Sequence, residues 1–311
     1  MALDFLYLVL SIVGLYFGAE FALDAAEKIG ERFGLPPLLV GVFIIGFGTS
    51  LPEFFVSQIA CYRGSPDISL GNIVGSNIAN IYLILGIAGL LTIIRITERQ
   101  IKIQLIFHLI ITVLLSVFLF TKQVNFISSA ILIMFFIIYL FYSYRELKNH
   151  KDFLSTTRGK VHVVGTSTYI KLSSGFVLLY FGGELLVSSG TQFGLKLGIS
   201  KYVLSSVFVA FGTSFPELVT ALLACFKKKD VDLIIGNILG SNVFNVAFVL
   251  GSIGFYNISF NINFTSEIIM LLVAAILMLL LNLMGKNISK LVGVLFLGTY
   301  FFAIYNWVIN Y

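Results

Sequence analysis

The chain has 311 residues, of which 58% are hydrophobic and only 11% are charged, whereas soluble domains carry about a quarter charged residues. This composition excludes a soluble globular protein and indicates a protein that folds within a lipid bilayer. The formal charge of +5 requires no nucleic-acid partner, because basic residues that flank membrane spans and meet anionic lipid account for it.

Apolar stretches of about 20 residues, long enough to cross a bilayer, recur along the chain. We expect an all-α integral membrane protein with ten transmembrane helices, at residues 4–22, 36–61, 69–94, 103–121, 125–144, 171–190, 201–226, 233–257, 265–284 and 288–309. The first stretch lacks the positive flank and the cleavage site of a secretory signal, so we expect it to remain as a helix.

Two polar segments of the first half return in the second half. Residues 48–53 read GTSLPE and residues 212–217 read GTSFPE, and residues 71–80 (GNIVGSNIAN) return as residues 236–245 (GNILGSNVFN). The offsets are 164 and 165 residues, so the chain is a duplicated unit. We expect three parts, a first five-helix repeat at 1–144, a cytoplasmic linker at 145–170 and a second five-helix repeat at 171–311.

An odd number of spans in each repeat turns the second repeat upside down in the membrane relative to the first. The distribution of basic residues supports this prediction, because the loops on one side hold 16 of the 20 Lys and Arg residues. The other side holds the remaining four, which are Arg63, Lys122, Lys196 and Lys201. We therefore predict two inverted repeats with both termini outside the cell.

Glu53 and Glu217 lie well inside apolar spans, where an unpaired carboxylate costs at least a few kcal/mol. No Lys or Arg lies in the middle of any predicted span, so the sequence offers no partner for a salt bridge. We expect these carboxylates to be balanced by bound cations, by protons, or by both.

The residues around each acid supply further oxygen ligands. Thr49 and Ser50 lie four and three positions before Glu53, so the three side chains share one helix face. The second repeat has the same arrangement with Thr213, Ser214 and Glu217. Proline follows the serine by two residues in both motifs and cannot donate to the carbonyl one turn back, so each helix should kink or open there.

The second motif places polar side chains at a spacing of four residues. These neutral stripes are Asn72, Ser76 and Asn80 in the first half, and Asn237, Ser241 and Asn245 in the second. Each stripe extends about 12 Å along a helix, enough for more than one coordination position. Interhelical hydrogen bonding is the alternative role for these side chains.

Carboxylate, hydroxyl, amide and carbonyl oxygens suit hard cations, and Ca²⁺ and Na⁺ fit this ligand set better than Mg²⁺. Neither Cys61 nor Cys225 has a His or a second Cys at metal-ligand spacing, so we expect no zinc, haem or iron-sulfur cofactor. An intramembrane protease would need an Asp pair or a Ser with a His or Lys base, and no span supplies such a set. We expect a transporter, not an enzyme.

The two motifs, each present twice, resemble those of the sodium/calcium exchanger branch of the cation/calcium antiporter superfamily, and the chain looks like a prokaryotic member. The resemblance covers nearly the whole chain. It implies exchange of Ca²⁺ for Na⁺ by alternating access, with four ion sites between the two pairs of motif-bearing helices and with the first and sixth helices sliding across the rest. It also implies a multi-pass plasma-membrane protein that functions as a monomer in the lipid bilayer, with Ca²⁺ and Na⁺ as substrates and no cofactor.

The resemblance also implies a role for each site residue. Glu53 and Glu217 would be the central calcium ligands, and four hydroxyls would join calcium or sodium coordination, those of Thr49, Ser50, Thr213 and Ser214. The carbonyls of Gly46 and Ala210 would complete the outer sodium sites. The inner and middle positions would be lined by Ser76, Asn80, Ser241 and Asn245.

One residue departs from this pattern. By this resemblance, family members of the archaeal and plasma-membrane type carry Asp where this chain has Asn245. The predicted site of this chain therefore keeps only two acids. The alternative is therefore an antiporter with a different coupling ion, H⁺ or K⁺. The proton-coupled branch carries Glu where this chain has Gly75 and Gly240, which argues against proton coupling. A cation channel is the other alternative, although an inverted repeat within one chain favours alternating access.

Overall fold

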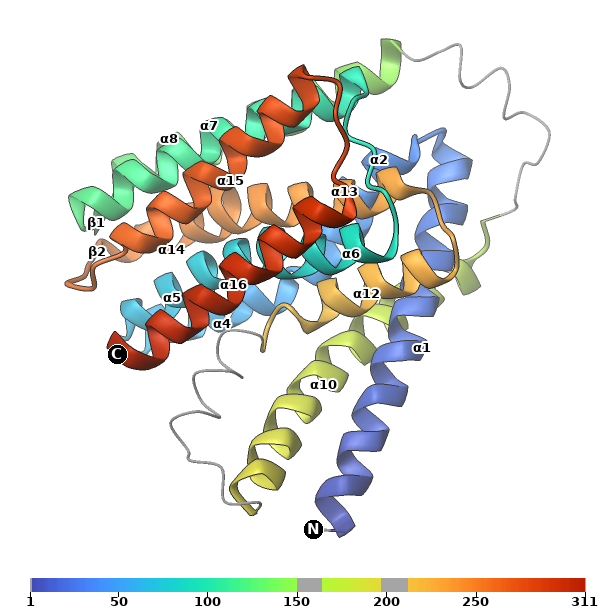
Figure 1. Ribbon diagram of the computed structural model, residues 1–311, viewed down its shortest axis with the longest axis horizontal. Helices are drawn as coiled ribbons and strands as arrows, with labels where there is room; N and C mark the ends of the chain where they lie inside the picture. The colour runs from blue at the N-terminus through green and yellow to red at the C-terminus, as the bar shows by residue number, and fades with distance from the viewer. Residues whose placement is uncertain (1, 150–163, 197–211, 311) are drawn as a thin grey trace.

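The computed structural model describes residues 2–149, 164–196 and 212–310, which are almost entirely helical (Figure 1). The elements of the first half are α1 (Ala2–Phe33), α2 (Pro37–Val40), the π-helix η1 (Gly41–Gly46), α3 (Phe47–Thr49), α4 (Leu51–Tyr62), α5 (Pro66–Ile78), the π-helix η2 (Ala79–Leu85), α6 (Gly86–Leu91), α7 (Arg99–Thr121), β1 (Gln123–Val124) and α8 (Phe126–Asn149).

The second half contains a corresponding series of elements. These are α10 (Thr166–Lys196), α12 (Phe215–Phe226), α13 (Val231–Val243), the π-helix η3 (Phe244–Leu250), α14 (Gly251–Ile253), the 3₁₀-helix η4 (Gly254–Tyr256), β2 (Ile258–Ser259), α15 (Thr265–Leu283) and α16 (Lys290–Asn310).

The described residues include eight helical stretches that are long and apolar enough to cross a membrane. Two shorter apolar helices, Phe215–Phe226 and Lys290–Tyr305, lie among them. The first part of the predicted span 201–226 lies outside the described residues, so α12 represents only its second part. The predicted all-helical membrane protein is confirmed, and the count of ten spans stays a prediction.

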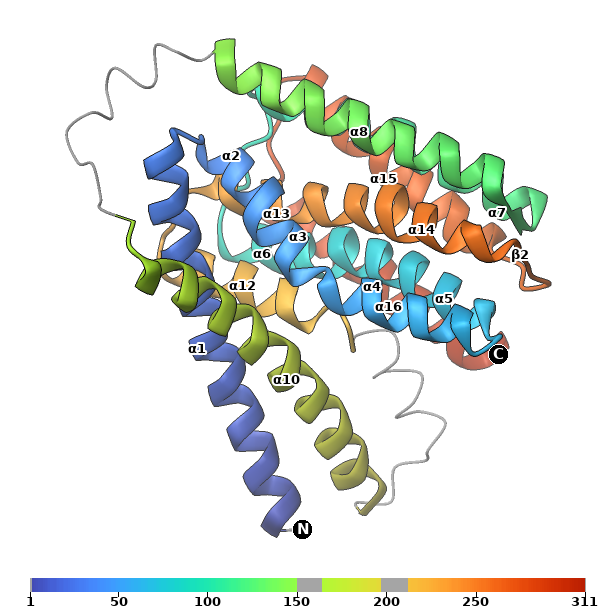
Figure 2. The same ribbon diagram turned by 180° about the vertical axis from the view of Figure 1, so that it is seen from behind.

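The helices that carry the repeated motifs form the centre of the molecule. In 18-residue apolar segments of Pro66–Leu91 and Val231–Tyr256, 83% and 94% of residues are buried, against 33% and 22% in such segments of α1 and α10. Figures 1 and 2 show α1 and α10 packed side by side and splayed away from the other helices, with α7, α8 and α15 on the opposite flank. The motifs are therefore enclosed by protein, whereas α1 and α10 are largely peripheral.

Short strand pairings join the connecting segments of the two halves. β1 pairs antiparallel with β2 through Gln123 with Ser259 and Val124 with Ile258. An isolated bridge joins Ile94 to Ile288. Because each pairing satisfies backbone groups of both connections, it holds the ends of neighbouring helices in register.

Several helices are longer than the apolar pattern predicted. α1 continues to Phe33, well past residue 22, where the first predicted span ends. α8 extends to Asn149 and α10 begins at Thr166, so both enter the predicted linker at 145–170. Hydropathy detects only the part of a helix that is apolar all round, and a helix continues beyond it wherever good helix formers and partners for its charges follow.

Candidate cation site

The helix that carries the first acidic motif is interrupted ahead of the acid, and α12 begins at the equivalent point of the second motif. α3 ends at Thr49 and α4 begins at Leu51, and Ser50 between them has φ −87° and ψ 5°. Ser214 has φ −86° and ψ 5° and precedes α12. Proline is near the start of both α4 and α12, where its missing N–H costs nothing. The predicted opening is confirmed for the first motif, whereas the residues that precede the second motif lie outside the described part of the chain.

Glu53 and Glu217 lie in the first turns of α4 and α12, and both are completely buried. Ser76 Oγ donates to Glu53 Oε1 at 3.3 Å, and Ser50 Oγ donates to Glu217 Oε1 at 3.0 Å. The Oε2 atom of each acid has no hydrogen-bond partner, and within the described ranges neither acid forms an ion pair. Each acid therefore has one carboxylate oxygen available to a cation.

The first cross-half contact joins the acidic motif of the second half to the polar stripe of the first. Thr213 Oγ1 lies 3.0 Å from Ser76 Oγ and donates to Asn72 Oδ1 at 2.9 Å. Asn72 in turn donates through Nδ2 to the Glu53 carbonyl at 3.2 Å. These bonds connect the surroundings of Glu53 to those of Glu217.

The second contact is the counterpart of the first. Thr49 Oγ1 lies 3.4 Å from Asn237 Oδ1 and donates to the Ile45 carbonyl at 3.0 Å. Ser241 Oγ donates to the Gly46 carbonyl at 3.0 Å. Residues predicted from separate motifs, 137 to 195 positions apart in sequence, are thus within hydrogen-bond distance of one another.

Two asparagines occupy equivalent positions near the start of the π-helices η2 and η3. Asn80 and Asn245 are both completely buried. Asn80 Oδ1 has no partner, and neither amide atom of Asn245 has one. The Ser214 hydroxyl is also buried without a partner. Such atoms are rare in folded proteins and are typical of sites that bind an ion or water. Ala210, the remaining predicted ligand, lies outside the described residues.

Close helix packing brings the stripes into contact with η1. A Cβ atom on Gly236 would lie 2.1 Å from the Leu38 carbonyl oxygen, and one on Gly240 would lie 2.7 Å from the Val42 Cα. Only glycine permits this approach. It allows Ser241 of α13 to reach the Gly46 carbonyl of η1.

Sequence reasoning missed the residues that support the asparagines. Asn72 Nδ2 donates to Ser57 Oγ at 3.1 Å, and Asn237 Nδ2 donates to Thr220 Oγ1 at 3.2 Å. Ser57 lies four residues after Glu53 and Thr220 three after Glu217, so helical spacing could have indicated both. The part of the chain that the structure describes holds no group of three or more His, Cys, Asp or Glu residues that could bind a metal. Neutral oxygens must therefore supply most ligands.

A second charged region lies where α1 meets the connection between α12 and α13. Lys227 pairs with Glu20 at 2.5 Å, Lys229 pairs with Glu27 and with Asp24, and Lys171 pairs with Asp24 at 3.1 Å. The hydrogen bond that Lys227 donates to Glu20 is the main cause that raises the pKa of Lys227 above its ordinary value. Glu20 belongs to α1 and Glu184 belongs to α10. The structure places both acids in the middle of long helices.

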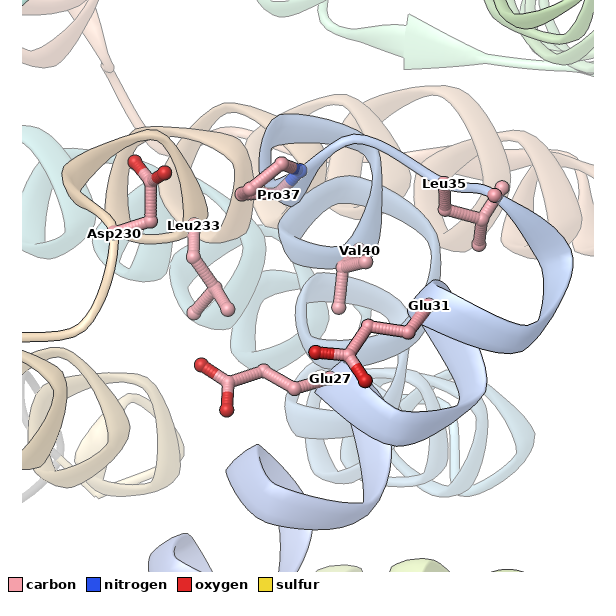
Figure 3. A pocket seen from close by; sticks show the side chains of 8 residues that line it. Glu27, Glu31, Leu35, Pro37, Val40, Asp230 and Leu233 are labelled. Carbon is pink, nitrogen blue, oxygen red and sulfur yellow. The ribbon is translucent and has the colours of Figure 1, made fainter. Parts of the chain in front are cut away.

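Beside these ion pairs is a cavity of about 260 Å³. Glu27 and Glu31 of α1 and Asp230 before α13 line it together with apolar residues of α2 and α13 (Figure 3). A separate groove of about 250 Å³ between α3, α4 and α10 is lined mainly by aromatic and aliphatic side chains. Neither cavity is lined by Glu53 or Glu217.

An all-helical, apolar fold around two buried acids of a duplicated motif defines a multi-pass membrane transporter for cations. The family described as sodium/calcium exchanger protein matches residues 3–145 and 169–308. The chain therefore belongs to the sodium/calcium exchanger family, and it has the antiporter fold of that family.

The individual relatives agree with this assignment. An uncharacterised membrane protein, MJ0091, of Methanocaldococcus jannaschii is 31% identical over 300 residues, covering 96% of each chain. The sodium/calcium exchanger MaX1 of Methanosarcina acetivorans is 26% identical over 343 residues, covering 96% of this chain and 97% of MaX1. A solved structure of the sodium-calcium exchanger NCX_Mj superimposes with a TM-score of 0.82 at 28% identity, covering 97% of this chain and 98% of NCX_Mj.

Proposed function

We propose that the protein exchanges Ca²⁺ for Na⁺ by alternating access, with the cations bound between Glu53 and Glu217. The observation that carries this proposal is the pair of buried acids, each with one unpartnered oxygen and with no basic partner in the described part of the chain. Two carboxylates balance the charge of one Ca²⁺ and supply up to four of its six to eight oxygens.

Neutral oxygens complete the ligand set. The hydroxyls of Thr49, Ser50, Thr213 and Ser214 would join the acids, and Ser76 and Ser241 of α5 and α13 with Asn80 and Asn245 of η2 and η3 would extend the set. The carbonyl of Gly46 would complete one outer site. We propose the carbonyl of Ala210, which lies outside the described residues, for the other. Hydroxyl and carbonyl oxygens in small numbers also suit Na⁺. Competition for shared oxygens would make binding of the two ions mutually exclusive, as antiport requires.

The membrane arrangement follows the duplication. We propose ten transmembrane helices in two inverted repeats, residues 1–144 and 171–311, joined by a cytoplasmic linker, with both termini outside and with the monomer as the transport unit. The predicted asymmetry of basic residues supports this orientation. Single cysteines placed at either terminus should react with impermeant thiol reagents added outside cells, and cysteines in the linker should not.

Asn245 supports a second candidate for the coupling ion. Its uncharged and unpartnered amide leaves the site with two acids, so K⁺ or H⁺ could replace Na⁺ as the counter-ion. The sodium/potassium/calcium exchanger 3 of Rattus norvegicus is 29% identical over 147 residues, 47% of this chain and 24% of that protein, which makes the potassium candidate the one to test first.

Calcium uptake into proteoliposomes tests these proposals when outward Na⁺, K⁺ and H⁺ gradients are imposed one at a time. We expect an outward Na⁺ gradient alone to drive uptake against a calcium gradient. Uptake driven only by a K⁺ or an H⁺ gradient would show that this ion, and not Na⁺, is exchanged for Ca²⁺. Calcium flux that needs no counter-ion gradient would indicate a channel.

A further inference from the structure

A buried chain of hydrogen bonds leads from α7 to the amide of Asn80. Asn80 Nδ2 donates to Asn242 Oδ1 at 2.9 Å. Asn242 Nδ2 lies 3.3 Å from the Asn77 carbonyl and 3.2 Å from His108 Nε2. His108 on α7 is 1% exposed, and Asn80 and Asn242 are completely buried. The proposed cation-binding function gives no role to His108 or Asn242.

The direction of every bond in this chain follows from the Asn77 carbonyl. A backbone carbonyl only accepts, so the Asn242 atom that faces it is the nitrogen Nδ2. The oxygen of Asn242 must then face Asn80, so Asn80 presents its nitrogen there and keeps its oxygen free. The second hydrogen of Asn242 Nδ2 points at His108 Nε2, which must accept it, so the ring is neutral and carries its proton on Nδ1.

The residues that correspond by the duplication to Asn80, Asn242 and His108 do not form such a chain of hydrogen bonds. Asn77, which corresponds to Asn242, donates to the Ile73 carbonyl of its own helix at 2.7 Å. Asn245, which corresponds to Asn80, has no partner on either amide atom. α15, which corresponds to α7, contains no histidine. One amide is therefore held in a fixed orientation, and its counterpart is free to present either its oxygen or its nitrogen.

We propose that His108 and Asn242 are positioning residues that hold the Asn80 amide with its oxygen directed at the transported cation. This inference rests on the proposed function, because it assigns Asn80 Oδ1 to the ion. A fixed carbonyl oxygen binds a cation without losing rotational freedom, whereas an amide that could rotate would also present hydrogens that repel the cation. Removing the acceptor atom of His108 should therefore weaken cation binding and have little effect on the maximal rate of transport.

The test compares three substitutions on α7 in sodium-driven calcium uptake by proteoliposomes. His108→Leu removes the acceptor, and His108→Gln retains an oxygen that can accept from Asn242. Gln104→Leu is the matched control, because Gln104 is also buried on α7 but bonds to Tyr139 and Ser143. We expect His108→Leu to raise the half-saturating Ca²⁺ concentration roughly three- to tenfold, the equivalent of one hydrogen bond, with the maximal rate nearly unchanged.

His108→Gln and Gln104→Leu should stay close to the unsubstituted protein in half-saturating Ca²⁺. Equal values for His108→Leu and His108→Gln, or an unchanged value for His108→Leu, would overturn the inference. Should the leucine variant fail to fold, His108→Met is the replacement, because it has a similar volume and only a weak acceptor. If the unsubstituted protein shows no sodium-driven uptake, the proposed function fails, and the same comparison is made on the shift of melting temperature that Ca²⁺ produces.

Discussion

Glu53→Gln and Glu217→Gln remove one charge each from the candidate site and leave its shape intact. Glutamine Oε1 can accept from Ser76 or Ser50 as the carboxylate does. Glutamine Nε2 takes the place of the Oε2 atom, which has no hydrogen-bond partner in the structure. Because the existing hydrogen bonds are kept, any change in function reports the lost charge and the lost ligand oxygen.

The expected magnitude follows from the burial of both acids. Breaking a fully buried charge pair by removing one member costs about 3–5 kcal/mol. At about 1.4 kcal/mol per tenfold, Ca²⁺ affinity should fall by roughly two to four orders of magnitude. The loss for Na⁺ should be smaller because Coulomb attraction scales with the product of the charges.

Calcium uptake into proteoliposomes measures the loss of transport, and thermal unfolding in detergent measures the loss of Ca²⁺ binding. Uptake should be abolished in both variants. Ca²⁺ at a hundred times the dissociation constant should stabilise the unsubstituted protein by about 2.7 kcal/mol, and this stabilisation should disappear in the variants. Without Ca²⁺ the variants should unfold at an equal or higher temperature, because a buried carboxylate without a counter-charge has been removed.

Glu267→Gln provides the matched control. Glu267 on α15 is also buried, at 4% exposed, but its carboxylate accepts from Trp307 Nε1 at 2.5 Å and from Ser266 Oγ at 2.8 Å. Its substitution should leave calcium uptake in place. Ca²⁺ affinity within tenfold of the unsubstituted protein in Glu53→Gln or Glu217→Gln, or an equal loss in Glu267→Gln, would refute the assignment of the two acids to the ion.

Three further predictions test other parts of the molecule. Asn245→Asp should change the sodium Hill coefficient or the pH profile of exchange more than the calcium affinity, because it adds an acid at a buried position with no existing partner; an unchanged coefficient and profile would contradict this. Substituting both Lys227 and Lys229 by Ala should change the exchange rate less than about tenfold and remove its salt dependence, because these ion pairs are partly exposed. Gly236→Ala should lower the melting temperature markedly because its Cβ would meet a backbone carbonyl at 2.1 Å, while Gly298→Ala, with no neighbouring atom within 4 Å, should not.

The sequence predicted the candidate site better than the extent of the helices. Pro52 predicted the opening next to Ser50, because a missing donor acts locally and needs no knowledge of the fold. The burial of the two acids followed from their place within apolar spans. Duplication also predicted that the second half would repeat the motif arrangement of the first. The contact of Thr213 with Asn72 and that of Thr49 with Asn237 are such a pair of counterparts.

Contacts made only in the folded molecule could not be predicted in the same way. The approach of His108 to Asn242 depends on how α7 packs against α13, and 134 residues separate them. The ion pairs of the lysines at residues 227–229 could not be predicted from the sequence either. Their pairing with Glu20, Asp24 and Glu27 depends on α1 continuing past its apolar part to Phe33, which hydropathy alone does not detect.

The distribution of contacts around α1 and α10 suits a pair of helices that moves against the rest of the molecule. The two pack tightly on each other, and a Cβ on Gly18 or Gly175 would come within 2.8 Å of the facing backbone. The ion pairs that link α1 to the connection between α12 and α13 have side chains that are 23–31% exposed, and such pairs are worth about 0–1 kcal/mol each. Breaking these links costs little, whereas the motif helices are joined by buried hydrogen bonds that are costly to leave unmade. Movement of α1 and α10 as one unit over a fixed site should therefore cost less than separating the motif helices, and we propose it as the movement that alternating access would use.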